Sequence, residues 1–301
     1  MAELIDGKKQ AQKIIDNIAN YKKILFQETQ CIPSLAVILI GNDKASNSYI
    51  NAKKKRAEEC GFIVTIHRFE NNITQQKLIS FIQNLNNNPK INAILVQLPL
   101  PSALDTQQIC QAISPLKDVD GFNYVNTGHL WYNGLKNYAH NSALLPCTPI
   151  GIMQLIQAIH GQDLSQMNAV IIGRSNIVGK PIAALLLTAN ATITIAHSKT
   201  KNLEQLCRNA DILVAAAGRP KLIGKNHIKP GATIIDVGIN KSKNNKLVGD
   251  VDFEAVLNLA KFITPVPGGV GPMTIAMLMY NTLKASCLQN NYTIFDLNSA
   301  N

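Results

Sequence analysis

Residues 169–187 have the sequence AVIIGRSNIVGKPIAALLL, in which an apolar run, a glycine-containing turn and a helix start follow one another directly. The apolar run predicts a buried parallel strand, and Gly173 allows a tight turn after it. Gly179 allows close packing at the helix start, and Pro181 suits a first turn, where a missing N–H is no loss. Such a strand, turn and helix N-terminus can hold a dinucleotide pyrophosphate. Because the spacing is G-x-S-x-x-x-G rather than G-x-G-x-x-G, a plain glycine turn stays open as an alternative.

The residues after the next strand favour NADP over NAD. Residues 191–196 alternate β-branched residues and predict the second strand of a βαβ unit. An NAD site has an acidic residue about 20 positions past the glycines, whereas His197, Ser198 and Lys199 follow this strand. A carboxylate would repel a 2′-phosphate, and a hydroxyl with a nearby cation such as Arg174 would bind it. The alternatives are a solvated loop arginine and an ordinary turn serine.

Length and composition favour two medium domains over one large domain, in a reducing compartment. The chain has 301 residues, of which 46% are hydrophobic, enough to bury roughly three quarters of its surface. It contains no apolar run of membrane-spanning length, and its N-terminus lacks the apolar core of a signal peptide, so we expect a cytoplasmic protein without membrane contact. The six cysteines are scattered without a C-x-x-C pair, which argues against a disulfide framework and against a zinc site.

The net charge of +10 suits phosphate-bearing partners. The lysines are spread along the chain, and aromatic residues make up only 5% without any interleaved stacking pattern, which argues against nucleic-acid binding. A surplus of cations equally suits small polyanionic ligands such as NADP and polyglutamylated substrates.

Strands and helices are expected to alternate throughout, which predicts a mostly parallel sheet in each half. Residues 118–147 are polar and lack periodicity, and we interpret them as a crossing between domains. An opening helix is expected from about Ala2. Strands are expected at 35–40, 63–68, 93–97, 170–172, 191–196, 212–216, 233–237 and 262–264, and further helices at 44–60, 74–85, 106–113, 148–160 and from 273.

The first half carries the groups that can do chemistry. Tyr49 and Lys53 share a helix face, where a phenol beside an ammonium can hold a proton donor and acceptor in register. Gln97 ends a predicted strand, and ligands bind beyond the carboxyl ends of parallel strands. Asp120 in DVDGF can accept two hydrogen bonds from an amidine-like ring edge. The alternatives are an ordinary exposed pair for Tyr49 and Lys53, a plain turn for Gln97 and a turn cap for Asp120. Residues 265–274, PVPGGVGPMT, predict a stiff ligand-contacting loop.

Several motifs occur together in a fixed order. They are SYINAKKKRAEECG (48–61), VQLPLP (96–101), DVDGF (118–122), PCTP (146–149), GRSNIVGKP (173–181), HSKT (197–200), DVGIN (236–240) and PVPGGVGPMT (265–274). With them the chain resembles the bifunctional methylenetetrahydrofolate dehydrogenase/cyclohydrolase family over nearly its whole length. The resemblance implies two α/β domains flanking a cleft, the second a Rossmann-like NAD(P)-binding domain. It assigns residues 1–146 with 273–301 to a folate-binding catalytic domain and residues 147–272 to the NADP-binding domain.

The resemblance also implies residue roles. Lys53 would handle protons and help orient the folate, with Tyr49 against the folate ring, Gln97 as the partner of the lysine and Asp120 at the pterin-like edge. Further substrate contacts would come from Val96, Leu98, Pro267, Gly268, Gly269 and Val270, and cofactor contacts from Gly173, Arg174, Ser175, Ser198 and Ile239.

The implied activity is NADP-dependent oxidation of 5,10-methylenetetrahydrofolate to the methenyl form, followed by hydrolysis to 10-formyltetrahydrofolate. The expected partners are tetrahydrofolate one-carbon derivatives and a second copy of the chain, paired through the cofactor domains. A monofunctional dehydrogenase is the main alternative. A non-enzymatic binding protein and a nucleic-acid binder stay open behind it.

Overall fold

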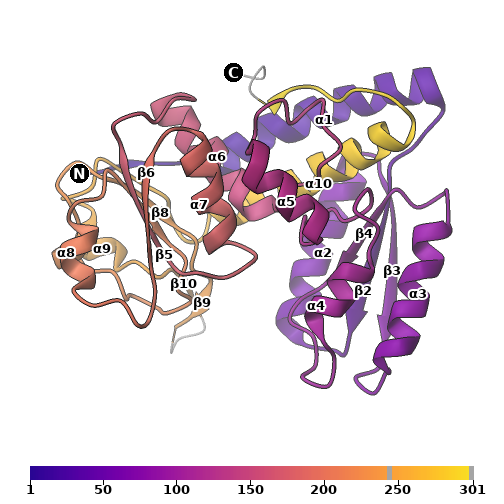
Figure 1. The fold of residues 1–301 in the computed structure, drawn as a ribbon, viewed down its shortest axis with the longest axis horizontal. Helices are drawn as coiled ribbons and strands as arrows, with labels where there is room; N and C mark the ends of the chain where they lie inside the picture. The colour runs from indigo at the N-terminus through magenta and orange to yellow at the C-terminus, as the bar shows by residue number, and fades with distance from the viewer. Residues whose placement is uncertain (243–245, 298–301) are drawn as a thin grey trace. The chain divides into compact units, whose positions relative to one another are not determined.

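Two parallel sheets organise the chain, each in a unit of its own. The computed structural model describes residues 1–242 and 246–297, so the last four residues of the predicted range 273–301 lie outside the described part. Helices and strands alternate in both units (Figure 1), which confirms the predicted α/β class. Unit 1 consists of Met1–Gln12, Leu130–Leu135 and Thr148–Thr274, and unit 2 of Lys13–His129, Lys136–Cys147 and the chain from Ile275 onward.

Unit 1 contains a six-stranded sheet in the order β1-β11-β8-β7-β5-β6, and all of its strands are parallel. The strand β5 pairs with β6 on one side and β7 on the other, so the winding direction changes at the end of β5, where ligands of such sheets bind. The strands are β1 (Glu3–Leu4), β5 (Asn168–Ile172), β6 (Thr192–Ala196), β7 (Ile212–Ala215), β8 (Thr233–Asp236) and β11 (Phe262–Ile263).

The expected opening helix from Ala2 was wrong at its start. The first residues form β1, and the helix α1 (Gly7–Thr29) begins only after it. The amide of Ile5 donates to the carbonyl of Ile263, so sheet pairing satisfies this backbone. The carboxylate of Asp6 accepts from the amide of Lys9 at 3.0 Å, which caps the helix start. Residues Met1–Gln12 accordingly belong to unit 1.

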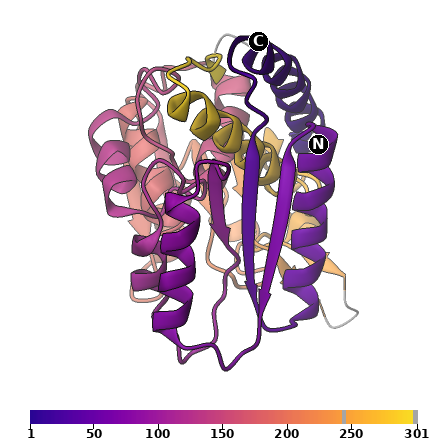
Figure 2. The ribbon, with the colours of Figure 1, turned by 90° about the vertical axis from the view of Figure 1, so that its right-hand side faces the viewer.

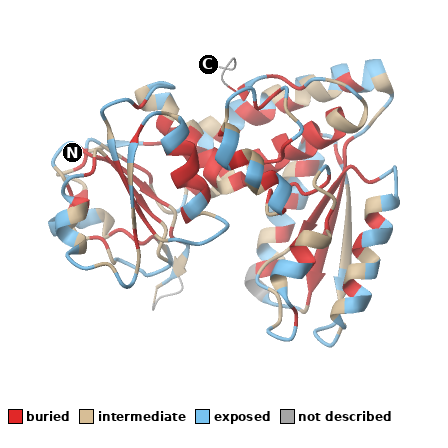
Figure 3. Ribbon diagram, viewed as in Figure 1, coloured by how far each residue is buried: buried red, intermediate tan, exposed pale blue. Residues whose placement is uncertain are grey.

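The remaining elements of unit 1 include several that the sequence did not predict. Each of those is at most five residues long, too short to show a helical or strand period. Buried residues, red in Figure 3, concentrate in the inner strands β5, β7 and β8 and in α7. The predicted helices are α6 (Cys147–His160) and α7 (Gly179–Thr188); the additional elements are α8 (Leu203–Cys207), η1 (Lys225–His227), α9 (Phe253–Val256) and the antiparallel ribbon β9 (Asn240–Lys241) with β10 (Leu247–Val248).

Unit 2 contains a three-stranded parallel sheet in the order β3-β2-β4. Figure 2 shows these strands side by side, flanked by helices. The central strand is buried at every position, whereas the edge strand β3 is mostly half-exposed. The strands are β2 (Ser34–Ile40), β3 (Ile63–Phe69) and β4 (Ala93–Val96), and the helices between and after them are α2 (Lys44–Glu59), α3 (Gln75–Asn87) and α4 (Thr106–Ala112).

Local sequence signals fix both ends of α2. The carboxylate of Asp43 accepts from the amide of Ser46 at 2.8 Å and from its hydroxyl at 3.0 Å. At the other end Gly61 adopts φ +71°, and its amide and that of Phe62 bond back to the carbonyls of Glu58 and Ala57. The helix that carries Tyr49 and Lys53 therefore has a defined register.

The segment 118–147 contains a helix that its sequence did not reveal. The helix α5 (Tyr124–Asn133) begins after Asn123, whose side chain accepts from the amide of Val125 at 3.0 Å. Its sequence, YVNTGHLWYN, is poor in strong helix formers, so tertiary contacts decide its conformation. The last helix, α10 (Val270–Gln289), begins three residues before the expected Met273.

A buried lysine on α10 makes the stability of unit 2 depend on pH. The side chain of Lys284 is fully buried. Its Nζ donates to the carbonyl of Tyr138 and to Oδ1 of Asn141, and lies 3.5 Å from the centroid of the Tyr138 ring. Burial lowers the pKa of Lys284 to about 6, from an ordinary value of 10.5. Between these two values the unfolded chain binds the extra proton, so the free energy of unfolding rises by about 1.4 kcal/mol per pH unit.

We expect Lys284→Met to remove this pH dependence. Urea unfolding of both proteins between about pH 6.5 and 8.5 should show a stability difference that grows in favour of the wild type as pH rises, by about 1 kcal/mol per unit. Lys90→Met, which replaces an exposed lysine, should parallel the wild type. If the free energy of unfolding of Lys284→Met followed the same pH dependence as that of the wild type, Lys284 would be charged in the folded protein.

Candidate active site and cofactor pocket

Three of the residues predicted to do chemistry meet in unit 2. Lys53 on α2 is buried, with 6% of its surface exposed. Its Nζ donates to Oε1 of Gln97 at 3.0 Å and lies 5.1 Å from the centroid of the Tyr49 ring. Gln97 directly follows β4, and its Nε2 donates to the carbonyl of Leu98 at 2.6 Å. That bond turns Oε1 toward the lysine, so the amide holds Nζ in place.

Burial sets the protonation of this cluster. It lowers the pKa of Lys53, while the negative charge of Asp120 acts in the opposite direction. Burial also raises the pKa of Asp120, which Lys53 partly offsets. The pKa of Tyr49 is raised by burial and then by Asp120 and Cys147. Lys53 can therefore exchange a proton more readily near neutral pH than an ordinary lysine, while Tyr49 keeps its phenol proton.

The neighbouring cations are not the cause of the lowered pKa. Lys54, Lys55 and Arg56 follow Lys53 directly and could lower its pKa by like-charge repulsion. Lys54 pairs with Glu58 at 3.6 Å and Arg56 with Glu59 at 2.8 Å on the outer face of α2. Desolvation is the largest influence on Lys53, and these three residues do not contribute to its shift.

The two aspartates of the DVDGF motif have different surroundings. Asp118 is buried, and its Oδ2 accepts from the amide of Asn123 at 2.7 Å and from Nδ2 of Asn126 at 3.1 Å. Burial raises the pKa of Asp118 to about 7 against these hydrogen bonds. The carboxylate of Asp120 accepts no hydrogen bond from any described residue and is influenced by Lys53. Asp118 therefore stabilises the turn. The carboxylate of Asp120 remains free to accept hydrogen bonds.

Cys147 is a member of this cluster that the sequence analysis did not assign to the site. Its Sγ donates to the carbonyl of Val119 at 3.1 Å, and its side chain is 4% exposed. Burial and the charge of Asp120 raise its pKa well above the ordinary thiol value. The thiol is thus neutral and packs against the backbone beside Asp120. The PCTP motif was its only signal in the sequence.

A cavity of about 380 Å³ lies in unit 1 beyond the carboxyl ends of β5, β6 and β7. Four of the five predicted cofactor contacts line it, namely Gly173, Arg174, Ser175 and Ser198. None of its lining residues is acidic, and two are arginines, which suits a phosphate-bearing ligand. The lining consists of Ile172, Gly173, Arg174, Ser175, His197, Ser198, Thr200, Leu203, Ala216, Ala217, Arg219 and Leu222.

The glycine turn beside this cavity has no room for side chains. Gly173 has φ +130°, and a Cβ there would lie 2.1 Å from the carbonyl oxygen of Ala216. A Cβ on Gly179 would lie 2.2 Å from the carbonyl oxygen of Gly173. The hydroxyl of Ser175 accepts from the amides of Val178 and Gly179 at 3.1 and 3.2 Å and so caps the start of α7. The close backbone approach and the helix N-terminus fit a dinucleotide pyrophosphate.

The other predicted contacts are not part of these two groups. Ile239 is 56% exposed after β8 and does not line the cavity. Val96 is buried within β4. Pro267, Gly268 and Gly269 precede α10, which begins at Val270, and all four residues lie in unit 1; Pro267 is exposed, whereas Gly269 is buried. A Cβ on Gly7 would lie 1.9 Å from the carbonyl oxygen of Gly269. The ligand contacts of these residues stay predictions.

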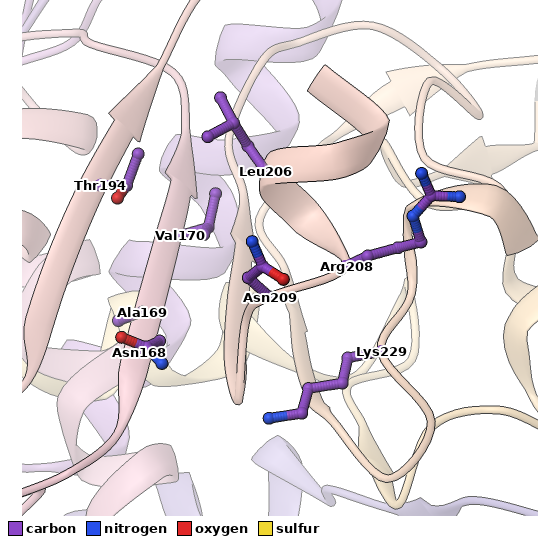
Figure 4. Close-up of a pocket in the computed structure, with 8 residues that line it drawn as sticks. All are labelled: Asn168, Ala169, Val170, Thr194, Leu206, Arg208, Asn209 and Lys229. Carbon is purple, nitrogen blue, oxygen red and sulfur yellow. The ribbon is translucent and has the colours of Figure 1, made fainter. Parts of the chain in front are cut away.

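A second cavity in unit 1, of about 420 Å³, lies at the opposite end of β5 (Figure 4). Asn168, which begins β5, lines it together with Arg208 and Lys229. Lys229 is paired with Asp211 at 2.6 Å. Because ligands of parallel sheets bind at the carboxyl ends of the strands, this cavity is not the cofactor site.

Within residues 1–242 and 246–297 no cluster of His, Cys, Asp and Glu is arranged to hold a metal ion. Across the same residues, no helix has the length and apolar character needed to cross a membrane.

Comparison with known proteins identifies the family. Residues 5–120 match the catalytic domain of tetrahydrofolate dehydrogenase/cyclohydrolase, and residues 146–290 match its NAD(P)-binding domain. The chain belongs to the tetrahydrofolate dehydrogenase/cyclohydrolase family. The family predicted from the sequence motifs is thereby confirmed.

Relatives and solved structures of this family cover nearly the whole chain. The "Bifunctional protein FolD" of Sinorhizobium fredii is 51% identical over 96% of this chain and 94% of its own length, and that of Brucella ovis is 50% identical over 95% and 97%. A Campylobacter jejuni bifunctional dehydrogenase/cyclohydrolase aligns with a TM-score of 0.89 and 44% identity over 95% of this chain and 99% of its own. A Trypanosoma brucei relative, solved with NADP and an inhibitor, aligns with a TM-score of 0.87 and 36% identity over 95% and 97%.

Proposed function

We propose that this protein oxidises 5,10-methylenetetrahydrofolate with NADP and then hydrolyses the methenyl product to 10-formyltetrahydrofolate. The observation that carries the proposal is the buried Lys53, bonded to Gln97 and facing Asp120, because a dehydrogenase alone needs no such proton-handling group. Relatives at 50 and 51% identity are named as bifunctional proteins, which favours this function over a monofunctional dehydrogenase.

For the oxidation, the protein's contribution is positioning. NADP, when bound, supplies the hydride acceptor. Gly173 and Ser175 would hold its pyrophosphate at the start of α7, and Arg174 and Ser198 would contact its 2′-phosphate. Hydride transfer requires no acid or base, so alignment of the folate by Tyr49 and Asp120 carries this step.

For the hydrolysis, Lys53 is the proton-handling group. Water attacks the cationic methenyl carbon, and a proton must leave the water before the ring opens and a ring nitrogen is protonated. The neutral amine of Lys53 accepts the first proton, and its ammonium form donates the second. Burial favours the neutral amine, and Gln97 fixes its position at 3.0 Å, so the same group serves as base and then as acid.

The proposal extends to domains, assembly and compartment. We assign folate binding to residues 1–146 with 273–301 and NADP binding to residues 147–272, as the family resemblance implies, although Met1–Gln12 and Leu130–Leu135 pack with the cofactor unit. We further propose a homodimer paired through the cofactor unit, supported by β6, which pairs only with β5 among the described strands and offers a free sheet edge. The unpaired state of all six cysteines supports a cytoplasmic location.

A two-stage absorbance assay tests the proposed function. Purified protein with methylenetetrahydrofolate and NADP should form the methenyl compound, and methenyl compound supplied alone should decay faster than without protein. Formation without accelerated decay would establish the monofunctional alternative. If the protein catalysed neither of the two reactions, the proposal would be overturned.

We expect Arg174→Ala to weaken NADP binding selectively. A charge-assisted hydrogen bond contributes roughly 1.5 to 3 kcal/mol, so the KM for NADP should rise about 10- to 100-fold while that for NAD hardly changes. Lys180→Ala is the matched control, since this cation of α7 bonds to Asn176 and does not line the cavity. Equal effects of Arg174→Ala on both cofactors would assign Arg174 to the pyrophosphate or to the fold.

A further inference from the structure

A buried asparagine on the last helix uses its whole amide on the backbone near the Lys53 cluster. Asn281 on α10 is fully buried. Its Nδ2 donates to the carbonyls of Val119 and Leu145, each at 2.8 Å, and its Oδ1 accepts from the hydroxyl of Tyr138 at 2.7 Å. Both amide hydrogens and the amide oxygen are engaged, so this side chain has one orientation.

The two carbonyls lie close in sequence to Asp120, whose charge raises the pKa of Lys53, and to Cys147. Val119 directly precedes Asp120, and Leu145 lies two residues before Cys147. The Cys147 thiol also donates to the carbonyl of Val119, and its Sγ lies 3.5 Å from Nδ2 of Asn281. One amide thus ties together two segments that are far apart in the sequence.

The direction of the Asp120 side chain depends on the hydrogen bond between the Asn281 amide and the Val119 carbonyl. Its carboxylate accepts no hydrogen bond from a described residue, so no side-chain contact orients it toward Lys53. The neighbouring Asp118 fixes the turn that follows, through Asn123 and Asn126. On the preceding side, Asn281 and the Cys147 thiol both donate to the carbonyl of Val119. The backbone held in this way determines where the Asp120 side chain points.

We propose that Asn281 is a positioning residue of the folate site, which directs the Asp120 carboxylate toward Lys53 through the carbonyls of Val119 and Leu145. The inference rests on the proposed function, because it assigns a task to Asp120 there. Asn281 itself does not touch the reacting atoms.

The proposal makes a prediction that a purely structural role does not. Asn281→Leu keeps the number and branching of the side-chain heavy atoms but removes both donors, so the Val119 carbonyl is freed to move and Asp120 with it. Because Asp120 raises the pKa of Lys53, a displaced carboxylate lets that pKa fall. We expect the Lys53-dependent limb of the pH profile for methenyl hydrolysis to move down by about 0.5 to 1 unit. The folate KM should rise about 10-fold, and the NADP KM should stay within about 2-fold of wild type.

The experiment compares three variants with the wild type in both reactions, together with their melting temperatures. Thr282→Val is the matched control, because Thr282 is equally buried and its hydroxyl bonds only to Leu278 within α10. It should keep the wild-type pH profile and folate KM even if it melts earlier. Tyr138→Phe removes the bond that orients the Asn281 amide and should shift the pH profile in the same direction, by less. This variant decides the question if Asn281→Leu fails to fold.

The outcomes separate this inference from the proposed function. Lower melting temperatures of Asn281→Leu and Tyr138→Phe with unchanged pH profiles and folate KM values would overturn the positioning role. A wild-type protein without methenyl hydrolysis would instead overturn the bifunctional proposal. The folate KM of the dehydrogenase reaction would then still decide the role of Asn281.

Discussion

Lys53→Met should reduce methenyl hydrolysis by about 100- to 10,000-fold, the range in which general acid–base catalysis acts. Methionine keeps the unbranched shape of the side chain and removes the nitrogen that accepts and returns the proton. Oxidation of the methylene substrate should fall less, because hydride transfer needs alignment rather than a base. The two absorbance rates, measured on the same enzyme preparation across pH, give the comparison.

The pH profile adds a second criterion for Lys53. Burial lowers the pKa of this residue, so one limb of the wild-type hydrolysis profile should fall below the ordinary lysine range and should vanish in Lys53→Met. Lys54→Met is the control, because Lys54 is exposed and pairs only with Glu58 on the surface, a contact worth about 1 kcal/mol or less. Hydrolysis by Lys53→Met at near the wild-type rate would show that another group handles the proton.

Periodicity and chain punctuation marked Tyr49, Lys53 and Gln97 as candidates, the family resemblance implied their roles, and Cys147 was missed. Tyr49 and Lys53 share a face because four residues make about one helical turn, and Gln97 follows a short apolar run, as a residue at the carboxyl end of a strand does. The sequence alone could not show that Nζ meets Oε1 of Gln97 at 3.0 Å. That contact depends on the register of β2 against β4 and on the placement of α2 over them.

Elements without local signals could not be predicted. The two residues of β1 become a strand only because β11 offers a parallel partner, and sheet pairing then delays the start of α1. The helix α5 begins at an asparagine cap within a polar segment that shows no helical period. Asn281 lies within an apolar helix as one more core position, and its task appears only when the carbonyls of Val119 and Leu145 are seen at its amide.

The sequence also could not separate Asp118 from Asp120, since both fit a turn. Hydrogen bonds separate them, because Asp118 holds Asn123 and Asn126 whereas Asp120 is left open. Asp120 is half-exposed, and its carboxylate accepts from no described residue, so it is free to accept hydrogen bonds from a ligand.

Asp120→Asn should therefore impair both reactions together. An amide offers a donor where the carboxylate accepts, and the loss of two charge-assisted hydrogen bonds to the folate ring edge predicts a fall in kcat/KM of about 100-fold or more. The melting temperature should hardly change, because no described residue loses a hydrogen-bond acceptor. Removing the negative charge should also move the Lys53 limb of the hydrolysis profile to lower pH, since Asp120 raises the pKa of Lys53.

Asp118→Asn provides the comparison for this variant. The amide of asparagine is a weaker acceptor than the carboxylate for the hydrogen bonds from the Asn123 amide and the Asn126 side chain. We therefore expect the free energy of unfolding to fall by about 1 to 3 kcal/mol. Folate affinity, measured by fluorescence titration beside thermal unfolding, distinguishes the two aspartates. Asp120 would be a turn residue and no ligand contact if Asp120→Asn bound folate normally and melted earlier. Weakened binding in an equally stable protein would instead assign its open carboxylate to the substrate.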